Sequence, residues 1–151
     1  MTPSQSQVAG DPQAQLLCTM PGIGPYAALL ILSDIGDVRR FPDSRRLCSY
    51  AGLVPAVYAS GGTTRRGALT KQGSKWLRWI LVELSVHAIA GAPQFRALYH
   101  QVARRHGRNT GRVPVARAML KAIYAMLRKG EPFKALPPRT TGQRRGVMAA
   151  A

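Results

Sequence analysis

Apolar residues recur every three or four positions along much of the chain, which is the spacing of amphipathic helices. In PVARAMLKAIYAMLRK, one helical face would carry Ala116, Met119, Leu120, Ile123 and Leu127. The stretch SKWLRWILVELSVHAIA is apolar on most sides, so we expect a central and largely buried helix there. The pattern predicts six helices, over about 12–20, 25–35, 44–50, 74–90, 93–106 and 114–129.

Residues that start and stop helices support these boundaries. Pro25 fits the first turn of the second helix, and Asp43 and Ser74 are natural N-caps for the third and fourth. Gly52 and Gly107 can end helices in a backbone conformation that other residues rarely adopt.

The remaining segments complete the expected organisation. Residues 54–59 are typical of a short extended segment, and residues 60–73 of an irregular basic loop or short hairpin. We expect a disordered leader at 1–11 and a disordered basic tail at 134–151. The prediction is one mostly α domain over 12–133, with a helix-hairpin-helix element at about 16–35, the extended segment, the basic loop and a small helical bundle at about 74–129.

The charge distribution indicates a polyanionic partner. Lys and Arg number 22 against six Asp and Glu, giving a net charge of +16. Four basic and four acidic residues precede Ser60, whereas 18 basic and only two acidic residues follow from there on. Nucleic acid is the best candidate, because no apolar stretch is long enough to span a membrane and no secretory signal opens the chain. Cys18 and Cys48 lack metal-ligand spacing, so we expect reduced cytosolic thiols and no metal site.

Helical wheels gather part of this charge. Arg117, Lys121 and Arg128 fall on one side of the last helix, and Lys75 and Arg78 share a sector of the fourth with Ser85. An ordinary solvated face is the simpler interpretation, although such faces usually mix both signs of charge.

Two stretches are candidates for phosphate contact. In LLCTMPGIGPYAALLIL, the turn at Gly22, Ile23 and Gly24 could let backbone N–H groups approach a DNA or RNA phosphate, or could simply join two helices.

In SGGTTRRGALTKQG, Ser60 stands beside Gly61 at the head of a basic loop. A solvated loop is the alternative, and Thr63 and Thr64 are rival hydroxyls. Cations could surround a phosphate and stabilise charge developing on it, namely Arg65, Arg66 and Lys71 in the loop and Lys75 and Arg78 beyond it.

The serine loop and its flanks resemble the insertion-sequence family 110/116/902 transposases, which are RNA-guided serine recombinases. The resemblance is carried by a GLVP element, a serine-glycine pair, a basic loop, a Leu-Thr-Lys-x-Gly run and a Trp-Leu-Arg helix start, and covers about residues 16–133. It implies that Ser60 is the nucleophile that links covalently to DNA during strand exchange. It also implies DNA, a guide RNA and a homo-oligomer as partners.

Full-length members of that family begin with an RNase H-like domain whose four acidic residues bind metal. Nothing in this sequence corresponds to that domain. We therefore expect the C-terminal transposase domain alone, with no cofactor in this chain and Mg²⁺ in the missing domain. The isolated chain should be inactive. The rival interpretation is a non-enzymatic basic helix-hairpin-helix protein that binds DNA or RNA.

Overall fold

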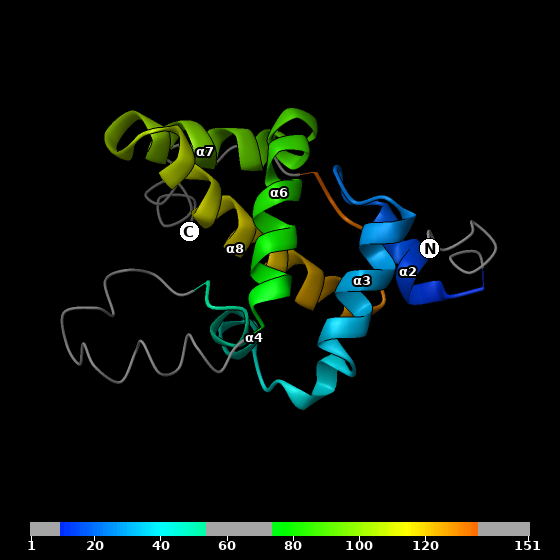
Figure 1. Ribbon diagram of the computed structural model, residues 1–151. Coiled ribbons are helices and arrows are strands. Elements are labelled where there is room, and N and C mark those ends of the chain that lie inside the picture. Colours follow the sequence, from blue (N-terminus) through cyan, green and yellow to red (C-terminus); the bar gives the residue numbers. More distant parts are fainter. Residues whose placement is uncertain (1–9, 54–73, 136–151) are drawn as a thin grey trace, which may run out of the picture.

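The computed structural model describes residues 10–53 and 74–135, and within these ranges the regular structure is entirely helical (Figure 1). This confirms the prediction of a mostly α fold. The predicted extended segment at 54–59 and the basic loop at 60–73 lie outside the described residues. In chain order the elements are α2 (Pro12–Cys18), α3 (Pro25–Ile35), the 3-10 turn η1 (Val38–Arg40), α4 (Ser44–Tyr50), α6 (Lys75–Gly91), α7 (Pro93–His106) and α8 (Arg108–Lys129).

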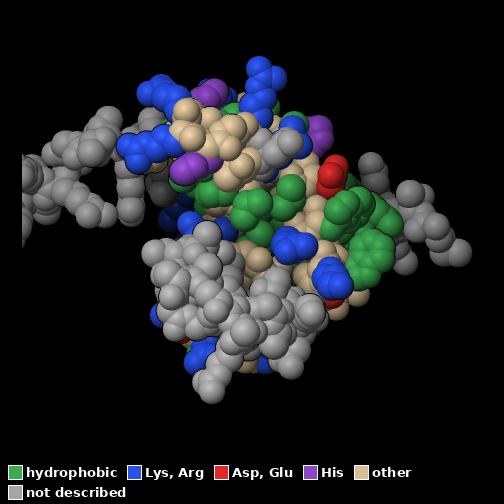
Figure 2. Space-filling model, turned by 60° about the vertical axis from the view of Figure 1, so that its left-hand side comes forward, with side chains coloured by type: hydrophobic (Ala, Val, Ile, Leu, Met, Phe, Trp, Pro, Cys, Tyr) green, Lys and Arg blue, Asp and Glu red, His purple; other side chains and the backbone are tan. Residues whose placement is uncertain are grey.

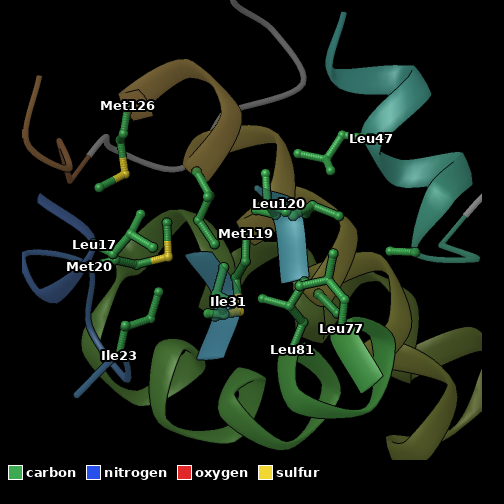
Figure 3. Close-up of a cluster of buried hydrophobic side chains, with 14 of the residues drawn as sticks. Leu17, Met20, Ile23, Ile31, Leu47, Leu77, Leu81, Met119, Leu120 and Met126 are labelled. Atoms are coloured by element: carbon green, nitrogen blue, oxygen red, sulfur yellow. The ribbon is translucent and has the colours of Figure 1, made fainter. Parts of the chain in front are cut away.

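The helices pack around α8, which contacts α2, α4, α6 and α7. In Figure 1, α6 crosses α8 near the middle of the molecule, α7 lies at the top and the α2–α3 hairpin lies to the right. Figure 3 shows Leu17 and Ile31 meeting side chains of α6 and α8 in the core. Within the described ranges, the largest fully buried side chains come from α2, α3, α4, α6 and α8 and from the segments that directly follow α2 and α4, and include Leu17, Met20, Ile31, Leu47, Leu77, Leu81, Met119, Leu120 and Ile123.

The caps predicted from the sequence are present. The Asp43 carboxylate accepts from the Arg46 N–H at 2.8 Å, and the Ser74 hydroxyl accepts from the Leu77 N–H at 3.1 Å. Each satisfies a backbone donor that the first turn of a helix cannot pair internally. Gly52 has φ 72° at the end of α4, which is the left-handed conformation expected there.

The start of α8 differs from the prediction. The sequence favours a helix from Pro114, because proline lacks the N–H that would bond four residues back. The helix instead begins at Arg108 and contains Pro114. Gly111 lies against Tyr99, and a Cβ added there would come within 3.0 Å of the ring. The residues by which α8 starts early are thus those that pack closely on α7.

The outer side of α6 also differs from the prediction. Leu77 and Leu81 are buried, but Trp76 and Trp79 are 73% and 56% exposed, so the helix is central without being covered on all sides. Ser85 is fully buried and donates to the Val82 carbonyl, so it does not share a solvated face with the cations of α6.

The segment after α8 contacts the residue that follows α2. The Phe133 N–H donates to the Thr19 hydroxyl at 2.8 Å, and the rings of Phe133 and Phe95 lie 5.7 Å apart. The Gln94 side chain also donates to the Lys134 carbonyl at 3.0 Å. Residues that follow α8 therefore join the end of α2 to the start of α7.

The turn between α2 and α3 packs directly on α6. Gly22 has φ 95°, and a Cβ added there would lie 3.0 Å from both the Ala88 nitrogen and the Leu84 oxygen. These contacts are with helix backbone, which cannot move aside as a flexible side chain would. The glycine is therefore what allows the hairpin to approach α6 this closely.

Replacing Gly22 with Ala should lower the free energy of unfolding by about 2–4 kcal/mol. The new Cβ would clash with the backbone of α6, and alanine would also be strained at a positive φ. Gly24→Ser is the matched control, since an added Cβ at Gly24 has no neighbour within 4 Å and serine suits the start of α3. The control should stay within about 0.5 kcal/mol of the unsubstituted chain in urea denaturation. Equal stabilities for the two variants would contradict this role of Gly22.

Candidate nucleic-acid interface

The predicted site residues fall into two groups. One group lies outside the described residues and comprises Ser60, Gly61, Arg65, Arg66 and Lys71. The structure describes the other group, which comprises Gly22, Ile23, Gly24, Lys75, Arg78, Arg117 and Lys121.

The residues on either side of the segment 54–73 are fixed to α4. The Leu53 N–H donates to the Cys48 carbonyl at 2.8 Å, and the Ser74 N–H donates to the Tyr50 carbonyl at 2.6 Å. Leu53 is also buried. The two points at which the chain leaves and re-enters the described structure therefore lie together at the end of α4.

Ser74 joins three helices at this position. Its hydroxyl hydrogen-bonds to the Asp34 carboxylate of α3 while it accepts from the Leu77 N–H of α6. The Tyr50 hydroxyl of α4 donates to the Asp34 carbonyl at 3.4 Å. We call Asp34, Tyr50 and Ser74 the loop anchor. Sequence reasoning found Ser74 as a cap but missed Asp34, because only the folded chain brings residues 34 and 74 together.

The four described cations of the predicted site lie on α6 and α8. Lys75 and Arg78 are exposed and follow the loop anchor directly. On α8, Lys121 is exposed and Arg117 is partly exposed, and the Arg117 carbonyl lies 3.9 Å from the Cys48 sulfur. No ion pair joins these four cations to another residue of the described ranges.

The pKa of Cys48 is affected by burial and by the cations of α8. Burial raises the pKa of its thiol to about 11, against a smaller opposing effect from the positive charges of Lys121 and Arg117. The thiol is therefore protonated at neutral pH and is a poor nucleophile. Its neighbourhood shows that the two α8 cations lie close to α4.

Two cations of the first half, Arg39 and Arg40, are already engaged within the chain. Arg39 pairs with Asp37 at 3.1 Å, and its hydrogen bonds are the main cause that lowers the pKa of Asp37. The Arg40 guanidinium lies 4.6 Å from the centre of the Phe41 ring and 5.0 Å from that of Tyr50, and it donates to the Ile35 carbonyl. These contacts leave both arginines less available to a phosphate.

The Pro-Gly-Ile-Gly turn presents little free backbone. Gly22 packs on α6, and the Ile23 N–H donates to the Met20 carbonyl at 3.1 Å. Gly24 is exposed and precedes α3. Phosphate contact at this turn stays a prediction, and Gly24 is the member of the turn that is best placed for it.

The described ranges hold no cluster of three His, Cys, Asp or Glu side chains that could bind a metal ion. None of the helices within them is both long and apolar enough to cross a bilayer.

Removing the Ser74 hydroxyl should destabilise the chain, because it deprives α6 of its cap and Asp34 of a donor. We expect Ser74→Ala to lower the free energy of unfolding by about 1–2 kcal/mol in urea denaturation. Ser33→Ala, at an exposed position one residue from Asp34, is the control and should change stability by less than about 0.5 kcal/mol. A Ser74→Ala variant as stable as the control would show that the loop anchor contributes nothing.

Comparison with known proteins gives a consistent picture. Residues 14–100 match the transposase IS116/IS110/IS902 family. The chain is 31% identical over 127 residues to a probable family 20 transposase of Pseudomonas aeruginosa, covering 82% of this chain and 38% of that protein. It is 32% identical over 125 residues to a pilin gene-inverting protein of Moraxella bovis, covering 80% and 38%.

A third relative is the uncharacterized 43.6 kDa protein of insertion element IS110 from Streptomyces coelicolor, 29% identical over 128 residues, with 84% of this chain and 32% of that protein covered. The chain thus spans roughly a third of the length of these relatives. Because the family match extends over more than half of its residues, the chain belongs to the IS116/IS110/IS902 family of transposases.

Proposed function

We propose that this chain is the part of a transposase that binds DNA and supplies Ser60 as the nucleophile for strand cleavage and exchange. The observation that carries the proposal is that both flanks of the serine-bearing segment 54–73 are fixed at the end of α4, Leu53 by Cys48 and Ser74 by the loop anchor. The exposed cations Lys75 and Arg78 follow directly. Family membership and the excess of positive charge from Ser60 onward support it.

In the proposed reaction, the Ser60 oxygen bonds to the phosphorus of a backbone phosphate while a deoxyribose oxygen leaves. Lys75 and Arg78, with Arg65, Arg66 and Lys71 of the loop, would stabilise the charge that develops on the phosphoryl oxygens. Cations are poor acceptors for the serine proton, so a base from outside this set must take it. The chain would thus hold half of an active site.

The other half would come from the partners that the family resemblance implies. We propose that an RNase H-like domain, a guide RNA and a homo-oligomeric assembly complete the reaction. The described residues hold no cluster of side chains that could bind the Mg²⁺ of that domain. We therefore propose no role for Mg²⁺ bound to this chain.

Binding to DNA should be electrostatic and should depend on the cations beside α4. If about six to eight phosphates are contacted, log affinity against log salt should have a slope of about −5 to −7. Replacing Arg117 and Lys121 together with Gln should flatten this slope by about one to two units. Fluorescence anisotropy with a duplex oligonucleotide at several salt concentrations measures both quantities.

The matched control removes the same charge from residues that already have partners. Arg39 pairs with Asp37, and Lys134 lies 3.8 Å from Glu131. Their double replacement by Gln should flatten the slope by less than about one unit. Salt-independent binding, or an equal effect of the two double variants, would refute the proposed interface.

The role of Ser60 can be tested by trapping its product. The isolated chain should bind DNA without cutting it. With the RNase H-like domain, Mg²⁺ and the guide RNA supplied, a protein–DNA adduct should appear on a denaturing gel. Ser60→Ala should abolish this adduct yet keep DNA affinity within about twofold, because one neutral hydroxyl contributes little to binding.

Thr63→Ala and Thr64→Ala are the controls and should leave the adduct in place. An adduct that persists in Ser60→Ala would assign the nucleophile to another residue. DNA binding with no adduct in the complete mixture would favour the non-enzymatic binding protein instead.

A further inference from the structure

An apolar groove of about 670 Å³ runs between α3 and α6 on the outside of the molecule. Tyr26 lines it from α3, and Trp76, Trp79 and Ile80 line it from α6. Figure 2 shows hydrophobic side chains gathered at the right of the face in view, bordered by an acidic side chain above and basic side chains below. The groove adjoins the loop anchor, because Asp34 belongs to both.

The aromatic rings of the groove are open to solvent. Trp76, Trp79 and Tyr26 are 73%, 56% and 51% exposed. The two indole rings lie edge to face with centroids 6.0 Å apart. In such a pair, the ring that contributes its edge keeps both of its faces clear of the other ring. An exposed apolar surface of this kind marks a site of interaction, and here it offers flat aromatic faces to a ligand.

Positive charge lies directly beside these rings. Lys75 stands four residues before Trp79 and three before Arg78, so the three side chains are neighbours on the surface of α6. Both cations are exposed, and neither forms an ion pair with a described residue. The two groups proposed above to contact a DNA phosphate therefore border the aromatic surface.

The two acidic residues of the groove limit where a phosphate can lie. The Asp34 carboxylate already accepts from the Ser74 hydroxyl. Glu83 stands eight residues after Lys75, about 12 Å along the helix axis, and forms no ion pair with a described residue. A nucleic-acid backbone is thus attracted to the end of the groove beside the loop anchor and repelled from the end beside Glu83. The part of a nucleotide that suits the groove itself is the uncharged base.

We propose that the groove binds an unpaired nucleobase of single-stranded DNA, stacked on an indole ring, while Lys75 and Arg78 hold a phosphate of the same strand. A duplex does not suit the groove, because its bases stack on one another and present only their edges and the phosphates. Aromatic rings next to cations are the general means by which proteins hold single strands with little regard to sequence.

The strand is DNA because the groove adjoins the flank of the segment whose serine is proposed to attack a DNA phosphate. In this respect the inference rests on the proposed function. It adds that the strand is unpaired where it passes the loop anchor. Stacking itself does not require the Ser60 hydroxyl, so the two proposals can be tested separately.

Tryptophan fluorescence observes the groove directly. The chain contains only two tryptophans, and both line the groove, so their emission reports on this surface alone. Stacking should make oligo(dT) quench the emission at least about twice as strongly as a blunt duplex of the same length. A titration of the unsubstituted chain at about 0.1 M salt measures both.

Substitution of Trp76 separates stacking from charge. Trp76→Leu should weaken oligo(dT) binding at least about fivefold, because leucine keeps the apolar contact but has no aromatic face. Trp76→Phe keeps such a face and should bind within about threefold of the unsubstituted chain. Both variants should keep duplex affinity within about twofold, since phosphate contacts dominate it. Fluorescence anisotropy with labelled oligonucleotides measures these affinities.

Val86→Ala is the matched control. Val86 is 43% exposed on the same helix and does not line the groove, so its truncation should change neither affinity. Circular dichroism on all variants verifies that the helices are retained.

Three results would overturn the proposal. One is quenching by oligo(dT) no stronger than by the duplex. Another is a Trp76→Leu variant that binds oligo(dT) as tightly as the unsubstituted chain, which would leave the salt-dependent DNA interface in place without the groove. The third is oligo(U) that binds at least about tenfold more tightly than oligo(dT) with the same dependence on Trp76, which would assign the groove to RNA. An adduct that persists in Ser60→Ala would contradict the proposed nucleophile and leave the stacking result unaffected.

Discussion

The close approach of the Gly22 turn to the backbone of α6 determines where α2 and α3 can lie. That position brings Ile31 of α3 into the core beside Leu77 and Leu81. It also sets the depth of the apolar groove, because α3 and α6 form its two walls. A single backbone contact thus links core packing on one side of α3 to an open surface on the other.

The loop anchor extends this dependence to the candidate site. Asp34 stands near the end of α3, so its bond to Ser74 requires α3 to be seated on α6. Tyr50 adds α4, which in turn contacts α8 near Arg117 and Cys48. The flanks of the serine segment and the cations on two helices are consequently held by one continuous set of contacts, and none of these contacts belongs to the serine segment itself.

Local signals in the sequence predicted most of the helix boundaries. Asp43 and Ser74 act on backbone groups within three residues, so their roles can be inferred without tertiary structure. The early start of α8 could not be inferred, because it accompanies packing of Gly111 on Tyr99. Asp34 and the exposed face of α6 were missed for the same reason: periodicity identifies apolar residues but does not show which helix covers them. The serine loop was recognised from its motif, and its structure lies outside the described residues.

The bond between Thr19 and Phe133 has a consequence for how the chain acquires its structure. It joins residues 114 positions apart, so closing it requires nearly the whole described chain to be present. Contacts of such long sequence separation are entropically costly to form early. During synthesis, α2 can pair locally with α3, but its contacts with α8 and the segment after it must wait until α8 has left the ribosome. Among the described helices, α2 therefore completes its packing only after α8 is available.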